Sequence, residues 1–217
     1  MGLADLHIHT VYSYDGTASV PAVLARAKQV GLDVVAITDH DEIRGALKAF
    51  ELAPRFDIEV IPGIEITTAE GDLLALFVTE KIQPGRPLLE TIVKVGEAGG
   101  ICLAPHPLAR GTGMKSLSSS SILRALDHPV TSRILLGIET YNATTLDRES
   151  NLLAQKLWRE CPGAAQVGNS DANLLDALWI GSTDIRQGEH LSSAQILGSW
   201  AWNFVMSAPA RIGMNYP

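Results

Sequence analysis

The chain has 217 residues, a formal net charge of −7 and 46% hydrophobic residues. This length suits one domain with a sizeable core, and the acidic balance argues against broad binding of nucleic-acid phosphates, which requires a basic surface. No apolar run reaches the roughly 18 residues of a membrane span, and no secretory signal is visible at the N-terminus, so we expect a cytoplasmic protein.

Strand-forming and helix-forming segments alternate from the start of the chain. A buried strand is expected over 3–8, and a second, rich in β-branched residues, over 32–38. Between them lies a helix for which Ser19 offers an N-cap and Gly31 a stop. Asp41 is expected to cap the next helix, over 42–52, which Pro54 ends.

The second part of the chain continues the alternation. Strands over 58–67 and 72–78 are close enough to form a hairpin around Glu70-Gly71. The further expected strands lie at 100–106, 134–141, 164–171 and 178–185, with helices at 87–100, 119–128 and 145–161. About seven strand–helix units predict an α/β fold with a mostly parallel sheet, near the size of a barrel.

We expect a single domain over 1–217, because no linker or repeat divides the chain. The tail from about 192 to 217 is rich in aromatic residues and has no partner strand. It is expected to pack as a terminal helix or to form a homo-oligomer contact. Neither Cys102 nor Cys161 lies in a C-x-x-C pair, so we expect two buried thiols and no zinc knuckle.

Polar residues stand where the predicted strands end, and in parallel α/β folds chemistry gathers at those ends. Single cases have structural explanations, such as a helix cap or a hydrogen-bonded surface histidine. Six strands nevertheless end in His, Asp or Glu, and four of the six histidines occupy such positions. The residues are His7, His9, His40, Asp41, Glu65, His106, Glu139 and Asp171. Because converging unpaired polar groups are costly to bury, this pattern indicates a bound cation.

The spacing of His7 and His9 supports the same interpretation. Side chains at i and i+2 of a strand point the same way, so both imidazoles can reach one ion at about 2.0–2.1 Å. Glu65 or Asp171 can bridge two ions. Mixed His and carboxylate ligands suit Zn, Mn or Fe, and two such ions can polarise a phosphoryl oxygen and supply a hydroxide.

Six motifs, in this order, carry a family resemblance. They are "DLHIHTVYSYDG", "AITDHD", "GIEI", "AHP", "GIETYN" and "NSDAN". Together they resemble the motifs of the polymerase and histidinol phosphatase (PHP) family of metal-dependent phosphoesterases, over about residues 5–185. The resemblance implies a distorted seven-stranded β/α barrel of the TIM-barrel-like kind with up to three metal ions.

The same resemblance implies a role for each matching residue. His7, His9, Glu65 and Asp171 would hold the first ion, and Glu65 would bridge to a second ion held by His106. Asp15 and His40 match the positions that hold a third ion. Asp39 and Glu139 match positions that orient ligands.

Two positions depart from the family pattern. Asp72 and Asn173 stand where histidines are usual. Asp72 can still ligate as an oxygen donor, whereas Asn173 is a poor neutral ligand. We therefore expect two divalent transition ions within a range of one to three, with the third site weak or absent.

A small phosphorylated substrate is the expected partner, since the net charge and the lack of an aromatic–basic groove argue against nucleic acid. Arg110 is either a phosphate contact or a solvated loop charge, with Arg44 and Lys115 as weaker candidates. Gly111 and Gly113 suggest a mobile loop.

The leading hypothesis is hydrolysis of a small phosphomonoester or nucleotide by metal-activated water, with His40 or His106 protonating the leaving oxygen. The alternatives are an exonuclease-like phosphodiesterase and a degenerate, non-catalytic metal-binding or interaction domain. Amidohydrolase-like chemistry is a further alternative, but it usually needs a bridging lysine that no strand end supplies.

Overall fold

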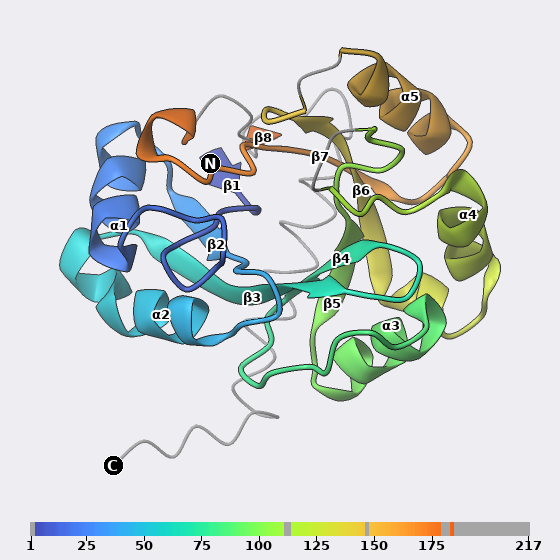
Figure 1. Ribbon diagram of the computed structural model, residues 1–217, viewed down its shortest axis with the longest axis horizontal. Coiled ribbons are helices and arrows are strands. Elements are labelled where there is room, and N and C mark those ends of the chain that lie inside the picture. The colour runs from blue at the N-terminus through green and yellow to red at the C-terminus, as the bar shows by residue number, and fades with distance from the viewer. Residues whose placement is uncertain (1–2, 111–113, 146–147, 179–182, 185–217) are drawn as a thin grey trace.

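The computed structural model describes residues 3–110, 114–145, 148–178 and 183–184. Helices cover the outside of a strongly curved sheet, with α1 and α2 on one side of the molecule and α3, α4 and α5 on the other (Figure 1). The strands are β1 (Leu3–Asp5), β2 (Val34–Ile37), β3 (Glu59–Thr67), β4 (Asp72–Leu76), β5 (Ile101–Ala104), β6 (Leu135–Asn142), β7 (Ala165–Asn169) and β8 (Thr183–Asp184). The helices are α1 (Val20–Gln29), α2 (Arg44–Phe56), α3 (Leu88–Glu97), α4 (Ser119–Asp127) and α5 (Arg148–Arg159), with short 3-10 turns at Thr131–Arg133 and Leu175–Ala177.

The sheet has the strand order β7-β6-β5-β4-β3-β2-β1, and the two-residue β8 is added at the β1 edge. Neighbouring strands are parallel except that β4 is antiparallel to both β3 and β5, and β8 is antiparallel to β1. The predicted hairpin between β3 and β4 is therefore confirmed. The predicted α/β fold, a distorted seven-stranded barrel, is confirmed as well, with β4 as the element that departs from parallel order.

The barrel is nearly closed. Its first and last strands, β1 and β7, approach each other, but no regular strand ladder joins them. Beyond the two strands, Ile8 and Ala172 form one isolated parallel bridge. Side chains make the other links, since the Leu6 N–H donates to Asn169 Oδ1 (2.9 Å) and the Ser170 N–H donates to Asp5 Oδ1 (3.1 Å). Three of the four predicted first-ion ligands follow β1 and β7 at this closure, namely His7, His9 and Asp171.

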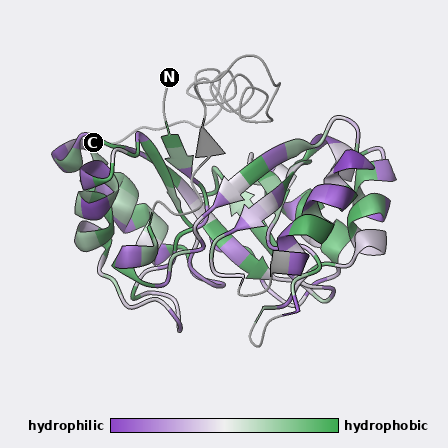
Figure 2. Ribbon diagram, turned by 90° about the horizontal axis from the view of Figure 1, so that it is seen from above, coloured by the Kyte–Doolittle hydropathy of each residue, from purple (hydrophilic) through white to green (hydrophobic). Residues whose placement is uncertain are grey.

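Alternate residues of the same strands form two separate apolar clusters. One cluster includes Leu73, Ala75 and Cys102 together with buried residues of every main helix, so it lies between the sheet and the helices. The other includes Leu74 and Leu103 and consists of residues of strands and strand ends, so it fills the barrel interior. Along the helices hydrophilic and hydrophobic residues alternate, as expected for helices that pack one face on a sheet (Figure 2).

Strand register places two acidic residues on the interior side. Glu65 pairs with Leu74, and residues directly opposite in an antiparallel pair point to the same face. Asp72 lies two residues before Leu74 and therefore faces the same way. The β3–β4 hairpin thus directs two carboxylates towards one end of the barrel interior.

The ends of the first two helices only partly follow the sequence-based expectations. Ser19 caps α1, because its Oγ accepts the Ala22 N–H, as predicted. The prediction that Asp41 caps α2 is wrong, since Asp41 has a left-handed φ of 51° and its Oδ1 accepts the Thr67 N–H instead. Pro54 lies inside the last turn of α2 and does not end the helix.

Both cysteines are buried and free, as expected. None of the helices in the described part of the chain has the length and apolar content needed to cross a bilayer. The predicted tail element over 192–217 and the glycines of the 111–113 loop lie outside the described residues.

Gly45, in the first turn of α2, provides a test of the packing beneath the site. A Cβ there would lie 1.9 Å from Asp39 Oδ2 and 2.9 Å from Thr10 Oγ1, and Asp39 accepts hydrogen bonds from both the N–H and the hydroxyl of Thr10. We expect Gly45→Ala to lower the free energy of unfolding by about 1–3 kcal/mol, measured by urea denaturation, because the new methyl group overpacks this contact.

Inside a helix, replacing glycine by alanine ordinarily raises the free energy of unfolding, by up to about 1 kcal/mol. Lys48→Ala, on the same helix, is the control and should change the free energy by no more than about 0.5 kcal/mol. A Gly45→Ala protein that is more stable than the parent would show that the contact between Asp39 and this helix can accommodate the added methyl group.

Candidate metal centre

Six candidate ligand side chains, from five separate segments, gather at one end of the barrel. They are His7 and His9 after β1, His40 after β2, Glu65 in β3, His106 after β5 and Asp171 after β7. All except His40 are buried. They form three overlapping groups of possible ligands, and in each group the ligand atoms lie within 4.8 Å of one another.

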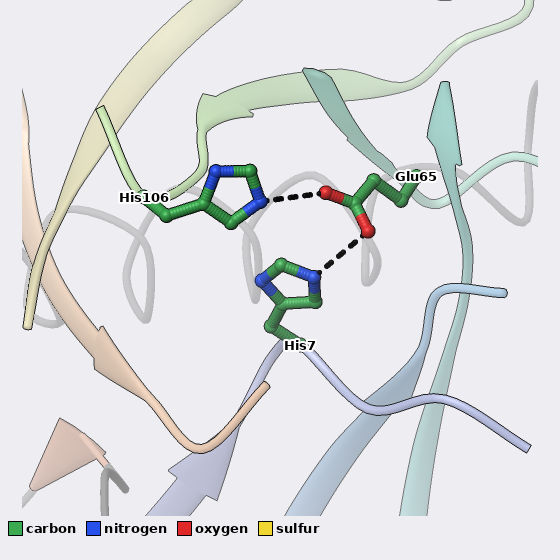
Figure 3. A group of neighbouring side chains, drawn as sticks. All are labelled: His7, Glu65 and His106. Atoms are coloured by element: carbon green, nitrogen blue, oxygen red, sulfur yellow. Dashed lines mark hydrogen bonds and ion pairs between the residues drawn. The ribbon is translucent and has the colours of Figure 1, made fainter. Parts of the chain in front are cut away.

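Glu65 occupies the middle of the cluster and uses both carboxylate oxygens. Its Oε2 lies 3.1 Å from His7 Nε2, and its Oε1 lies 2.9 Å from His106 Nε2 (Figure 3). The two imidazoles are far apart in the sequence, yet both point at this one carboxylate. A carboxylate with its two oxygens directed at different imidazoles has the geometry needed to bridge two cations.

A second group joins His7, His9 and Asp171. Asp171 Oδ1 lies 3.1 Å from His9 Nε2 and 3.4 Å from His7 Nε2, and the two Nε2 atoms are 3.2 Å apart. The alternation argument for His7 and His9 therefore leads to the observed arrangement, in which both rings face the same point. Two Nε2–H groups cannot face each other at this distance, so the pair is suited to a shared cation.

The third group is less enclosed and contains His9, His40 and Glu65. His40 Nδ1 lies 3.3 Å from Glu65 Oε2, but this buried nitrogen has no hydrogen-bond partner among the described residues. Its other nitrogen, Nε2, lies 3.4 Å from Asp15 Oδ2. Asp15 also accepts a hydrogen bond from the Ser13 hydroxyl at 2.6 Å, so it lies beside the cluster without joining one of the three groups.

Glu139 touches the cluster from outside and has its acceptor sites filled. It accepts hydrogen bonds from Asn169 Nδ2 (2.7 Å), the His106 N–H (2.6 Å) and Asn142 Nδ2 (2.9 Å). Its Oε1 also lies 3.2 Å from His7 Nδ1. An ionised carboxylate can only accept, so Nδ1 of His7 carries the hydrogen and Nε2 is directed at the cluster. Glu139 therefore orients a candidate ligand, the role that the family resemblance implied for it.

The charges of the cluster strongly shift its pKa values. Burial alone would lower the pKa of His9, but hydrogen bonds to Asp171 and Glu65 outweigh burial and raise it to about 10. Burial alone would raise the pKa of Glu65, but the charge of His7 and hydrogen bonds from the imidazoles lower it well below its usual range. His9 and His106 are thus drawn towards their cationic forms by buried carboxylates.

This arrangement fits divalent metal ions. The donor set consists of imidazole nitrogens and carboxylate oxygens, which suit transition metals. The unpartnered, buried His40 Nδ1 is one observation that a cation explains. The two facing Nε2 atoms of His7 and His9 are a second, because one cation can replace two protons that cannot both be placed there.

Comparison with known proteins places this arrangement in a family. The family model described as "PHP domain" matches residues 5–158. The chain belongs to the PHP family. The resemblance in the sequence motifs is confirmed, and divalent metal ions are what this family implies for the cluster.

Individual proteins are similar to this chain over different lengths. The uncharacterized protein MJ1587 of Methanocaldococcus jannaschii is 38% identical over 173 residues, which cover 75% of this chain and 95% of that protein. Phosphoribosyl 1,2-cyclic phosphate 1,2-diphosphodiesterase of Eggerthella lenta is 38% identical over only 65 residues, or 30% of this chain and 24% of that protein. Among solved structures, a candidate metal-dependent phosphoesterase of Bifidobacterium adolescentis aligns with a TM-score of 0.66 and 19% identity, covering 83% of this chain and 92% of that one, which supports the fold.

Asp72 and Asn173 mark where this PHP chain departs from the usual histidines. Asp72 is buried and its Oδ1 has no hydrogen-bond partner within the described ranges, whereas its Oδ2 accepts the Lys115 N–H at 3.2 Å. Burial, together with the negative charge of Glu65, raises the pKa of Asp72. Asp72 faces the cluster side of the hairpin but is in none of the three ligand groups. The main-chain carbonyl oxygen of Asn173 accepts the Thr17 N–H, and its buried side-chain Oδ1 has no hydrogen-bond partner among the described residues.

Arg110 lies at the end of the described segment 3–110 and is exposed. It follows the loop after β5 that also carries His106, as the sequence indicated. Among the described residues its side chain forms no hydrogen bond or ion pair with the cluster, so its role as a phosphate contact stays a prediction.

Asn142 is the main residue of the PHP site that sequence reasoning missed. Its side-chain Oδ1 accepts the backbone N–H groups of Thr144 (3.0 Å) and Thr145 (3.1 Å). These donors identify the oxygen end of the amide, so the Nδ2 end must face the carboxylates. Nδ2 lies 2.9 Å from Glu139 Oε2 and 3.0 Å from Asp171 Oδ2. The neutral amide of Asn142 therefore lies between the carboxylates of Glu139 and Asp171. The other oxygen of Asp171, Oδ1, stays directed at the histidines.

Asn142 belongs to the "GIETYN" motif, but strand alternation in this motif does not predict where its side chain points. Glu139 and Asn142 lie three residues apart in β6, but a strand with strict alternation would point them to opposite faces. The register between β6 and β7 shifts between Glu139 and Tyr141. This irregularity lets both side chains reach the same side, and it is a feature that the sequence does not indicate.

We expect Asn142→Asp to weaken divalent-metal binding by about 10- to 100-fold, the usual effect of losing a partner that orients ligands. The added carboxylate would face Glu139 and Asp171, and the repulsion would turn Asp171 away from His9. Competition with a chromogenic chelator measures the affinity, and circular dichroism checks that the variant is folded.

The matched control for this variant is Gln166→Glu, which adds the same charge on the neighbouring β7. Val167 belongs to the interior cluster, so the adjacent Gln166 points away from the site. Unchanged metal affinity in Asn142→Asp, or an equal loss in Gln166→Glu, would contradict the orienting role.

Proposed function

We propose that this PHP chain, acting as one domain over 1–217, is a metal-dependent phosphoesterase that hydrolyses a small phosphomonoester or a nucleotide. The observation that carries the proposal is the position of Glu65. Its two oxygens lie 2.9 Å from His106 Nε2, 3.1 Å from His7 Nε2 and 3.3 Å from His9 Nε2. Three buried imidazoles around one carboxylate provide ligands for two neighbouring ions.

In this proposal His7, His9, Glu65 and Asp171 hold the first ion. Glu65 and His106 hold the second, with Asp72 as an added oxygen donor, and Asp15 and His40 border a weaker third position. Zn, Mn or Fe are the metals that this donor set suits. When bound, such ions polarise a phosphoryl oxygen and lower the pKa of a water molecule to near neutrality.

The chain itself supplies orientation and protons. Glu139 holds the hydrogen of His7 on Nδ1, which keeps Nε2 directed at the cluster. His40 is the least buried imidazole of the cluster, with 11% of its side chain exposed, and its Nε2 faces Asp15. We infer that His40 is better placed than His106 to protonate a leaving oxygen, because His106 Nε2 is already directed at Glu65.

The ligand chemistry of the site supports the proposed substrate class more strongly than the similarity to named relatives does. The Eggerthella lenta relative is named as a diphosphodiesterase acting on a cyclic sugar phosphate, but its match covers only 30% of this chain. An exonuclease-like activity or a non-catalytic metal-binding domain remain the alternatives. Arg110 is proposed as a phosphate contact from the loop after His106.

The test of the proposed function is elemental analysis followed by a phosphate-release screen. We expect more than one tightly bound transition ion per chain and release of inorganic phosphate with Mn, Zn or Fe. His9→Ala should lower both the metal content and the rate by at least about 100-fold, because it removes a ligand shared by two groups.

His128→Ala is the matched control, since His128 is half-buried outside the cluster and its Nδ1 accepts hydrogen bonds from the backbone after α4. It should behave like the parent protein. A parent protein that binds metal but releases no phosphate from any ester would favour the non-catalytic alternative. A protein in which His9→Ala changes neither metal content nor rate would refute the proposal.

The raised histidine pKa values give a pH dependence with a definite sign. His9, with a pKa of about 10, is protonated at neutral pH in the metal-free protein. A metal ligand must be deprotonated, so metal binding releases protons and the apparent affinity rises as the pH is raised from 6 to 8, by up to about tenfold per unit for each proton released.

Calorimetric titrations in two buffers with different ionisation enthalpies count the released protons. We expect at least one proton per ion in the parent protein, and fewer in His9→Ala if that variant retains an ion. An affinity that does not change between pH 6 and 8 would mean that the histidines are not the ligands.

A further inference from the structure

Tyr14 is the most exposed large apolar or aromatic side chain in the described part of the chain, at 79% exposed. Its ring stacks on the His40 ring, with centroids 4.8 Å apart and planes 19° apart. His40 in turn stacks on His9, at 4.7 Å and 23°. Tyr14 is therefore the outer member of a three-ring stack that begins at a buried candidate metal ligand.

The loop that carries Tyr14 is held in place on both sides of the residue. The Ser13 N–H donates to the Thr10 carbonyl oxygen at 2.9 Å, and the His40 N–H donates to Ser13 Oγ at 3.2 Å. On the other side, the Thr17 N–H donates to the Asn173 carbonyl oxygen at 3.1 Å. The exposed ring is thus presented from a fixed backbone, with one face on His40 and the opposite face open to solvent.

The charges near the ring restrict what it can bind. Asp15 Oδ2 and Glu65 Oε2 lie 3.4 Å and 3.3 Å from the two ring nitrogens of His40, the ring on which Tyr14 stacks. The same carboxylates disfavour a second phosphate beside the ring and leave an uncharged planar group as the suitable partner.

We propose that the open face of Tyr14 is a stacking subsite for the base of a nucleotide whose phosphate ester lies at the metal cluster. This inference rests on the proposed phosphoesterase function and narrows its substrate class to esters that carry a planar base. Stacking of a base on an aromatic side chain tolerates different bases, because every base has a π face. Tyr14 would therefore favour nucleotides over sugar phosphates without selecting one base.

The test compares adenosine 5′-monophosphate with ribose 5-phosphate, which share the phosphoribosyl group and differ in the base. In the parent protein we expect a higher kcat/KM for the nucleotide. Tyr14→Ala should reduce the ratio of the two kcat/KM values by about tenfold, within the range measured for base–aromatic stacking. Tyr14→Phe keeps the ring and should retain the ratio within about twofold.

Phe50→Ala removes another exposed aromatic ring, 43% exposed on α2, and is the control for loss of an aromatic surface. It should leave the ratio unchanged. A Tyr14→Ala protein that loses activity equally on both esters would overturn the subsite, because the ring would then only support His40. A larger loss on ribose 5-phosphate would overturn it in favour of stacking by the sugar.

A binding measurement separates this inference from the proposed function. We expect the base protons of adenosine to shift upfield in NMR spectra with the parent protein and Tyr14→Phe, and to stay unshifted with Tyr14→Ala. If the parent protein hydrolyses neither ester but still gives these shifts, the subsite stands and the phosphoesterase proposal fails. If it hydrolyses the esters without shifts that depend on Tyr14, the subsite fails and the phosphoesterase proposal stands.

Discussion

The burial of Glu65 among imidazoles is the interaction on which the rest of the structure depends. A carboxylate removed from water is costly unless charged partners surround it. Here the partners come from segments after β1, β2 and β5, so the charge requirement ties together parts of the chain that are far apart in sequence. The imidazoles that offset the buried charge of Glu65 are also metal ligands. The contacts that make its burial possible can therefore also hold a cation.

The open seam of the barrel explains why these groups meet where they do. Between β1 and β7 the backbone forms one isolated bridge instead of a ladder, and the side chains of Asp5 and Asn169 make the remaining links. His7 and His9 leave β1 at this seam, and Asp171 leaves β7 there. Asn142 and Glu139, from β6, complete the arrangement by holding the outer atoms of Asp171 and His7. Asn169 links these two sets of hydrogen bonds, because its Oδ1 accepts the Leu6 N–H at the closure and its Nδ2 donates to Glu139.

The antiparallel β4 adds a second carboxylate to the site. Its hairpin with β3 returns Asp72 to the face that carries Glu65, at a position where the motif resemblance led us to expect a histidine. At the rim, the fixed loop after β1 presents Tyr14 on the face of His40. A more acidic interior and an aromatic rim are properties of this sequence rather than of the barrel, since the barrel requires neither. They are the features through which members of one fold come to differ in metal preference and substrate.

The sequence by itself determined the α/β alternation, the β3–β4 hairpin and the pairing of His7 with His9 on one side, because these depend on local periodicity and short turns. It also indicated the polar strand ends that converge, since parallel strands share an edge. Only the tertiary structure decided the roles of Asp41, Asn142 and Tyr14. Asp41 resembles a helix cap until its partner on β3 is known, Asn142 depends on a shifted register, and closure at Asn169 uses a partner 163 residues away. Such contacts arise from the packing of distant segments, and no local pattern encodes the distance between them.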